Sequence, residues 1–226
     1  SRKAASNAER RPTAASSTAG RAMADTRAVM AVSEAAANLL RAAYDPADFA
    51  APLDIRTITA REFASNPPDA GVSVFLYRIT ANGAHRIPAG RIDPDGRRRL
   101  TKLPVDLHFL LTVWGAEASL QHAVAGWMMR TLEDTPLLGA GALNAAAPGA
   151  FRHDEAVEFA LAELATEDLL RIWEVLGLNL YQLSIPYTAR CVRIESTAHE
   201  PEGGGAPVQE RIQDAGVPEP ARTLEG

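Results

Sequence analysis

Two apolar stretches dominate the pattern of hydrophobic and polar positions along this chain. Residues 105–114 (VDLHFLLTVW) alternate five apolar side chains onto one face, and much of the opposite face is apolar as well. Residues 71–79 (GVSVFLYRI) are also apolar on both faces. A strand with two apolar faces needs cover on both, from helices, a second sheet or another subunit. The pattern therefore predicts two neighbouring buried strands around which the remaining elements are placed.

Helical spacing of apolar positions predicts three helices, which cover residues 26–43, 117–132 and about 166–177. Thr26 has a side chain suited to cap the first helix, and Asp45-Pro46 is expected to end it. The third helix starts at Thr166, which two acidic residues follow, as a helix N-terminus favours.

Shorter alternating segments predict three further strands, at residues 53–59, 155–161 and 181–194. The second of these has Ala and Glu content that also suits a helix, and the alternation favours a strand. Pro186 lacks an amide donor, so we expect the last strand to lie at a sheet edge or to be bulged there. Residues 139–151 begin with Gly-Ala-Gly and are expected to form a flexible loop.

A polar excursion separates the two central strands, with Asp95-Gly96 near its middle. Asp-Gly between extended flanks is typical of a tight hairpin. Four basic residues occupy its returning side: Arg97, Arg98, Arg99 and Lys102. Such a run is most often a solvated loop. The alternative is an electrostatic contact with an acidic protein surface.

Composition divides the chain into a domain and two tails. Residues 1–25 hold five basic and two acidic residues and few large apolar ones, which predicts a disordered basic tail. Residues 26–196 form the expected domain. Residues 197–226 are rich in Gly and Pro, with six acidic and two basic residues, and are expected to be flexible. The net charge of −5 and the lack of a long apolar run favour neither nucleic acid nor a membrane as partner.

One pair of residues has the side chains needed for catalytic chemistry. His108 and Asp106 share a face of the central strand, and such a pair could perform acid–base catalysis, although it is more often a hydrogen-bonded structural pair. The five histidines lack zinc-binding spacing and no cofactor motif is present, so we expect no metal, no cofactor and no enzyme activity. Cys191 is the single cysteine and is expected to be a small buried packing residue.

Several segments taken together resemble one family. They are VSVFLYRITAN, LPVDLHFLLTVWG, LEDTPLL, LATEDLLRIWEVLG and YQLSIPYTARCVRI, in this order and spacing. The set is similar to the cap, or tail-terminator, proteins of extracellular contractile injection systems, which are phage-tail-like particles of the virulence-cassette and antifeeding-prophage type. The resemblance covers about residues 26–196. It does not extend to either tail.

This resemblance implies an α+β domain with a mostly antiparallel sheet flanked by helices. It also implies a structural protein that forms a homohexameric ring at the end of a particle and thereby fixes its length. The single cysteine and a polar N-terminal stretch without an apolar signal core separately predict synthesis and assembly in the cytoplasm. The expected partners are further copies of the chain, the inner tube protein and the sheath protein. A closed ring needs head-to-tail contacts. Our interface candidates lie in the basic hairpin and in the last strand: Arg97, Arg98, Arg99, Lys102, Pro186 and Tyr187.

Overall fold

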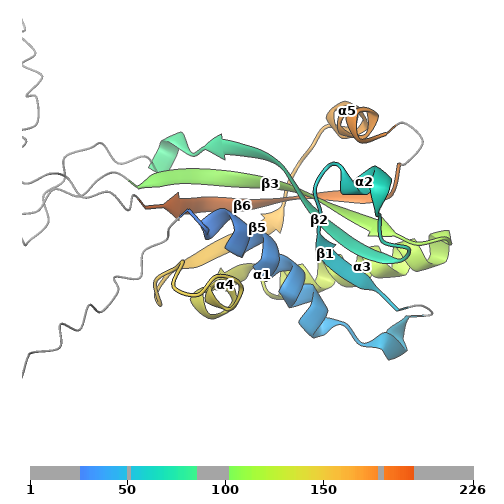
Figure 1. The fold of residues 1–226 in the computed structure, drawn as a ribbon, viewed down its shortest axis with the longest axis horizontal. Helices are drawn as coiled ribbons and strands as arrows, with labels where there is room; N and C mark the ends of the chain where they lie inside the picture. Colours follow the sequence, from blue (N-terminus) through green and yellow to red (C-terminus); the bar gives the residue numbers. More distant parts are fainter. Residues whose placement is uncertain (1–25, 50–51, 86–101, 178–180, 196–226) are drawn as a thin grey trace, which may run out of the picture.

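The computed structural model of the chain describes residues 26–49, 52–85, 102–177 and 181–195 (Figure 1). Its elements in chain order are α1 (Ala28–Ala43), η1 (Pro46–Asp48), β1 (Asp54–Thr57), α2 (Glu62–Ser65), β2 (Gly71–Ala81), η2 (Gly83–His85), β3 (Leu103–Trp114), α3 (Ala118–Asp134), β4 (Leu137–Gly139), α4 (Ala140–Ala146), β5 (Ala156–Leu161), α5 (Thr166–Leu176) and β6 (Ser184–Ile194).

The strands form one mixed sheet of six, in the order β1-β2-β3-β6-β5-β4. Only β1 and β2 run parallel, and every other pair is antiparallel. The two apolar stretches become β2 and β3, which pair with each other near the centre of the sheet. The prediction of an α+β domain with a mostly antiparallel sheet flanked by helices is therefore confirmed.

Helices α1, α3 and α4 cover one face of the sheet, where the main core lies (Figure 1). Alternation on β3 sends Leu107, Phe109 and Leu111 to this face, and all three are fully buried. Alanines on the inner side of α1 let the helix approach the strands closely, and Leu40 is buried beside them. Burying apolar surface in this way is the main favourable term in folding.

Helices α2 and α5 pack on the opposite face and cover only one end of it (Figure 1). A second, smaller core forms there from Ile58, Phe63, Trp114, Trp173 and Leu176. Phe63 meets Trp173 edge to face, with 5.5 Å between ring centroids. The two cores explain why β3 is apolar on both faces: helices flank this strand on both sides.

Two local predictions are wrong, and one short helix was missed. Residues 139–151 contain the end of β4 and then α4 instead of a loop, because the Ala-rich segment after Gly139 favours a helix. Helix α1 starts after Arg27, without a side-chain cap, so Thr26 does not cap it. The short helix α2 was not predicted.

The prediction for Pro186 is also wrong, because β6 lies inside the sheet between β3 and β5. Pro186 stands opposite Leu110 of β3 and just beyond the last paired residue of β5. There its carbonyl accepts a hydrogen bond from the amide of Ala162 at 3.0 Å. The missing N–H therefore affects only the end of the β5–β6 ladder, and the proline is tolerated.

The chain enters and leaves the described domain at the same end of the sheet. Helix α1 begins at that end and β6 finishes there, and these two elements contact each other (Figure 1).

The pairing of the central strands is irregular at two positions. The register of β3 with β6 shifts between Val105 and Leu107, and the register of β2 with β3 shifts between Leu76 and Arg78.

Candidate functional site

The predicted pair of His108 and Asp106 lies on the sheet face that carries α2 and α5, but the two side chains are bonded to other groups. His108 lies 2.9 Å through Nε2 from the hydroxyl of Thr80 and 3.4 Å through Nδ1 from that of Thr188. Each ring nitrogen thus has a hydroxyl partner on a neighbouring strand, Thr80 on β2 and Thr188 on β6. Burial, and secondly the nearby charge of Arg78, lower the pKa of His108, so the neutral imidazole is favoured.

Asp106 stabilises the irregular part of the neighbouring strand. Its Oδ1 accepts a hydrogen bond from the backbone amide of Cys191 at 2.7 Å, and both carboxylate oxygens accept from the Asn82 amide at 3.0 and 3.2 Å. Cys191 has a φ of 56°, in the left-handed region that residues other than glycine rarely adopt. It lies where the register of β3 and β6 shifts. A β-bulge of this kind leaves an amide without a ladder partner, and Asp106 provides one.

This geometry corrects two predictions. Cys191 is half-buried at the bulge and is not a packing residue of the main core. His108 and Asp106 do not hydrogen-bond each other, so the prediction that they form a hydrogen-bonded structural pair is wrong, and each is bonded to groups of neighbouring elements.

A second charged network surrounds Glu195, just after β6. Its carboxylate is only 8% exposed and forms ion pairs with Lys102, just before β3, and with Arg152, in the loop before β5. The Arg152 Nη2 atom lies 3.4 Å from Oε1. A carboxylate this buried is expected to need both cations. The network joins the start of β3 to the end of β6.

The predicted interface residues fall in different environments. Arg97, Arg98 and Arg99 lie outside the described residues, as does the Asp95-Gly96 turn. Lys102 is half-buried and bound to Glu195.

The two candidates in the last strand are not equally accessible. Pro186 is half-buried in β6. The structure corrects the prediction for Tyr187, because its side chain is only 1% exposed. Its ring stacks on that of Phe159 with 5.3 Å between the ring centroids, and burial raises its pKa to about 12.

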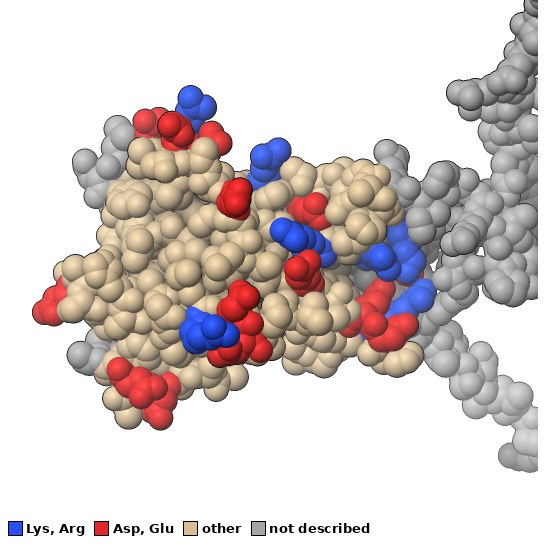
Figure 2. Space-filling model, turned by 180° about the vertical axis from the view of Figure 1, so that it is seen from behind, with Lys and Arg blue, Asp and Glu red and all other residues tan. Residues whose placement is uncertain are grey.

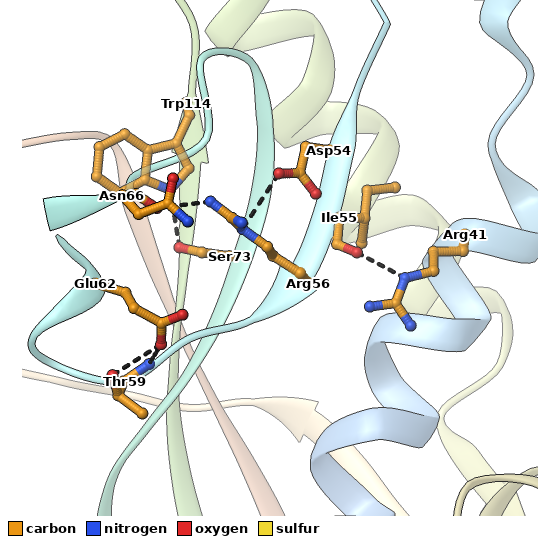
Figure 3. Close-up of polar contacts among 9 residues, drawn as sticks. All are labelled: Arg41, Asp54, Ile55, Arg56, Thr59, Glu62, Asn66, Ser73 and Trp114. Atoms are coloured by element: carbon orange, nitrogen blue, oxygen red, sulfur yellow. Dashed lines mark hydrogen bonds and ion pairs between the residues drawn. The ribbon is translucent and has the colours of Figure 1, made fainter.

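The outer edge of β1 is blocked by α1 (Figure 3). The guanidinium Nε of Arg41 donates to the carbonyl of Ile55 at 2.6 Å, a group that points away from β2. The hydroxyl of Thr57 donates to Glu34, which also forms an ion pair with Arg41. An open edge with unpaired backbone groups invites other strands, and Arg41 occupies one of these groups, the Ile55 carbonyl.

Figure 3 also shows how the turn before α2 is fixed, because Glu62 accepts from the Thr59 amide at 2.7 Å. That bond holds the pKa of Glu62 below its usual value.

Surface charges do not form one large field on the face seen in Figure 2, where acidic and basic groups lie interspersed around uncharged surface. Among the described residues, no cluster of three or more His, Cys, Asp or Glu side chains could hold a metal ion. Within the same residues, no helix has both the length and the apolar content needed to cross a membrane.

Comparison with known proteins gives a family match and several similar solved structures. A family model described as the Pvc16 N-terminal domain matches residues 31–209. A search of curated protein sequences finds no significant match.

One similar structure is titled "Cryo-EM Structure of an Extracellular Contractile Injection System, PVC sheath/tube terminator in extended state". It matches with a TM-score of 0.52 and 20% identity, over 88% of this chain and 63% of that one. Another is titled as the cap of the anti-feeding prophage, a tube-terminating cap, with a TM-score of 0.50 and 19% identity over 85% and 60%. The chain thus spans less than two thirds of either protein, and the likeness establishes a shared fold.

Proposed function

Because the chain belongs to the family of the Pvc16 N-terminal domain, we propose that it is a structural cap that terminates the inner tube and sheath of a contractile injection particle. The observation that carries this proposal is the fold. Over more than four fifths of its length, the chain resembles one protein titled as a sheath/tube terminator and another titled as a tube-terminating cap.

The proposed cap is a homohexameric ring that assembles in the cytoplasm at the end of a particle that is later released. In such a ring each copy uses two different surfaces, one for each neighbour. The remaining surfaces contact the tube and sheath proteins. Arg41 occupies one backbone acceptor of the edge strand β1, the carbonyl of Ile55, which disfavours strand pairing between copies at that position.

A structural role also agrees with the polar groups of the described domain. His108, Asp106 and Glu195 are each bonded to neighbouring strands or loops, and these contacts join elements of the fold. An enzyme that used His108 and Asp106 would instead lose its activity in a His108→Ala variant that keeps its fold. This is the outcome that would favour catalysis.

The experiment that tests the cap is the distribution of tube lengths in electron micrographs of particles made with and without this gene. We expect uniform particles with the gene, and long or variable ones without it. Unchanged lengths, together with absence of the chain from particle ends, would refute termination. Finding the chain along the tube or at the baseplate would favour a different component of the same particle.

Attachment to tube or sheath is proposed to involve the basic run of Arg97, Arg98 and Arg99. Reversing these three charges is expected to lower the number of caps retained on purified particles, because charge complementarity steers and orients protein contacts. Unchanged cap occupancy on purified particles would remove the run from the contact.

A further inference from the structure

Three exposed arginines share the sheet face that carries α2 and α5, at the end that these helices leave uncovered. Arg78 of β2 stands opposite His108, and Arg193 of β6 stands opposite Pro104. Both β3 residues alternate with the core side chains of that strand, so the two arginines lie on the face away from the main core. Arg190 lies on this face too, because the residue before it belongs to the main core. We call Arg78, Arg190 and Arg193 the arginine group.

Two members of the arginine group lack a carboxylate partner. Within the part of the chain that the structure describes, Arg78 and Arg193 form no ion pair. Arg190 lies 3.8 Å from Glu158. Asp106, a second carboxylate on this face, already accepts hydrogen bonds from the β6 bulge and from the end of β2. The charges of Arg78 and Arg193 are therefore available to an acidic segment.

An acidic segment of the same chain follows β6 directly. Residues 197–226 contain six acidic and two basic residues, and they begin four positions after Arg193. The first acids of the segment are Glu200 and Glu202, five and seven residues beyond Glu195. A fully extended chain spans about 3.4 Å per residue, so these two acids reach about 17 Å and about 24 Å from Glu195.

These lengths suffice to cross the arginine group. Arg193 and Arg78 stand opposite β3 residues that are four positions apart, on strands two spacings apart, so their Cα atoms lie about 16 Å from each other. By the same geometry, Arg78 lies about 22 Å from the end of β6. Glu202 therefore reaches Arg78 near full extension, and Glu210 reaches either arginine with slack.

We infer that residues 197–226 fold back onto the arginine group of their own chain and that their carboxylates pair with Arg78 and Arg193. A single exposed ion pair is weak, but tethering raises the effective concentration of the acids, and several of them are available to the same face. The inference goes beyond the proposed cap and does not depend on it. Its consequence is that an acidic partner has to displace this segment before it binds the arginine group.

Trypsin cleavage after Arg211 measures the contact on the full chain, because a bound segment is cut more slowly. Arg211 lies inside the acidic segment and precedes Ile212. At about 20 mM salt, the wild type is expected to be cut at least about fivefold more slowly than an arginine variant that carries Arg78→Glu and Arg193→Glu. At about 0.5 M salt the two rates are expected to agree, because salt screens exposed charges. Cleavage after Arg21, outside the acidic segment, is the internal control and is expected to be the same in both chains.

Two further variants separate this contact from a general effect of charge. Arg61→Glu with Arg130→Glu changes the net charge equally at exposed positions outside the arginine group, and this control is expected to be cut like the wild type. Glu200→Gln with Glu202→Gln is expected to speed cleavage as the arginine variant does. Because both sets of changes remove the same contact, their combined effect is expected to be smaller than the product of the separate effects.

Protection that does not change between about 1 and 50 μM chain supports a contact within one chain. Protection that grows with concentration would assign the arginine group to the segment of another copy and overturn the inference. Equal rates for the wild type and the arginine variant, or separate effects that multiply, would also overturn it. Unfolding midpoints close to that of the wild type show that the variants are folded. None of these results bears on the proposed cap, which particle length tests separately.

Discussion

Removing the carboxylate of Asp106 is expected to destabilise the domain without removing any apolar contact. In the wild type this side chain accepts from the Cys191 amide at 2.7 Å and from the Asn82 side chain at 3.0 and 3.2 Å. A hydrogen bond to a charged group contributes about 1.5–3 kcal/mol. The Asn82 side chain can turn to water, but the Cys191 amide in the bulge cannot. Asp106→Ala is therefore expected to lower the free energy of unfolding by about 2–4 kcal/mol.

Denaturant unfolding of the full chain measures this loss directly, with Asp154→Ala as the matched control. Asp154 is exposed in the loop before β5, so its removal is expected to change the free energy of unfolding by less than about 0.5 kcal/mol. Asp106→Asn keeps one acceptor oxygen and is expected to fall between the two. An Asp106→Ala protein as stable as the control, with no faster hydrogen exchange at the Cys191 amide, would refute the role of the carboxylate.

Three further predictions concern other features of the same domain. Cys191 has a φ of 56°, so Cys191→Gly is expected to raise the free energy of unfolding by about 1 kcal/mol, and Cys191→Val is expected to lower it. Thermal unfolding of the two variants and the wild type measures these differences. Trp173→Ala, in the second core, is expected to cost about 3–5 kcal/mol in denaturant unfolding, and a cost below about 1 kcal/mol would show that α5 is not held by this contact. Burial lowers the pKa of His108 in the folded chain, so protonation of this histidine favours the unfolded chain. As the pH falls from about 7 to about 5, the free energy of unfolding of the wild type is therefore expected to fall more than that of His108→Gln. Equal losses in the two proteins would contradict this.

The sequence predicts the central strands well because their pattern is local. Alternation in β2 and β3 needs only the order of side chains. It holds along β3 and along β2 as far as Leu76, after which a register shift moves Ile79 to the face of the main core. Gly139-Ala140-Gly141 resembles a loop by composition, yet the following residues fold as α4 because Leu143 reaches the main core. The Ala content of the segment is a local signal for a helix, whereas the burial of Leu143 depends on contact with α1, which is distant in the sequence.

Proline illustrates a different limit. Its missing amide predicts an edge position, but the outcome depends on which side the amide would face and where the neighbouring strand ends. The ladder with β5 ends at Leu161, opposite Tyr187, so Pro186 fits inside the sheet. Only the three-dimensional register contains that information.

The candidate site was predictable only in part. The shared face of His108 and Asp106 follows from alternation, but their partners Thr80, Thr188 and Cys191 come from other strands. The network of Glu195 joins residues that are 43 apart or more in the sequence. No local motif marks it, because a single glutamate at the end of a strand is ordinary.

The first helix, α1, and the last strand, β6, contact each other at one end of the sheet (Figure 1). When the first and last elements of a fold adjoin, a linker can join them, and the same strand order then forms wherever the new termini are placed. A short linker from Glu195 to Thr26 would preserve every strand pairing of the sheet. The domain is therefore suited to circular permutation, with new termini in a surface turn such as the one at Gly149.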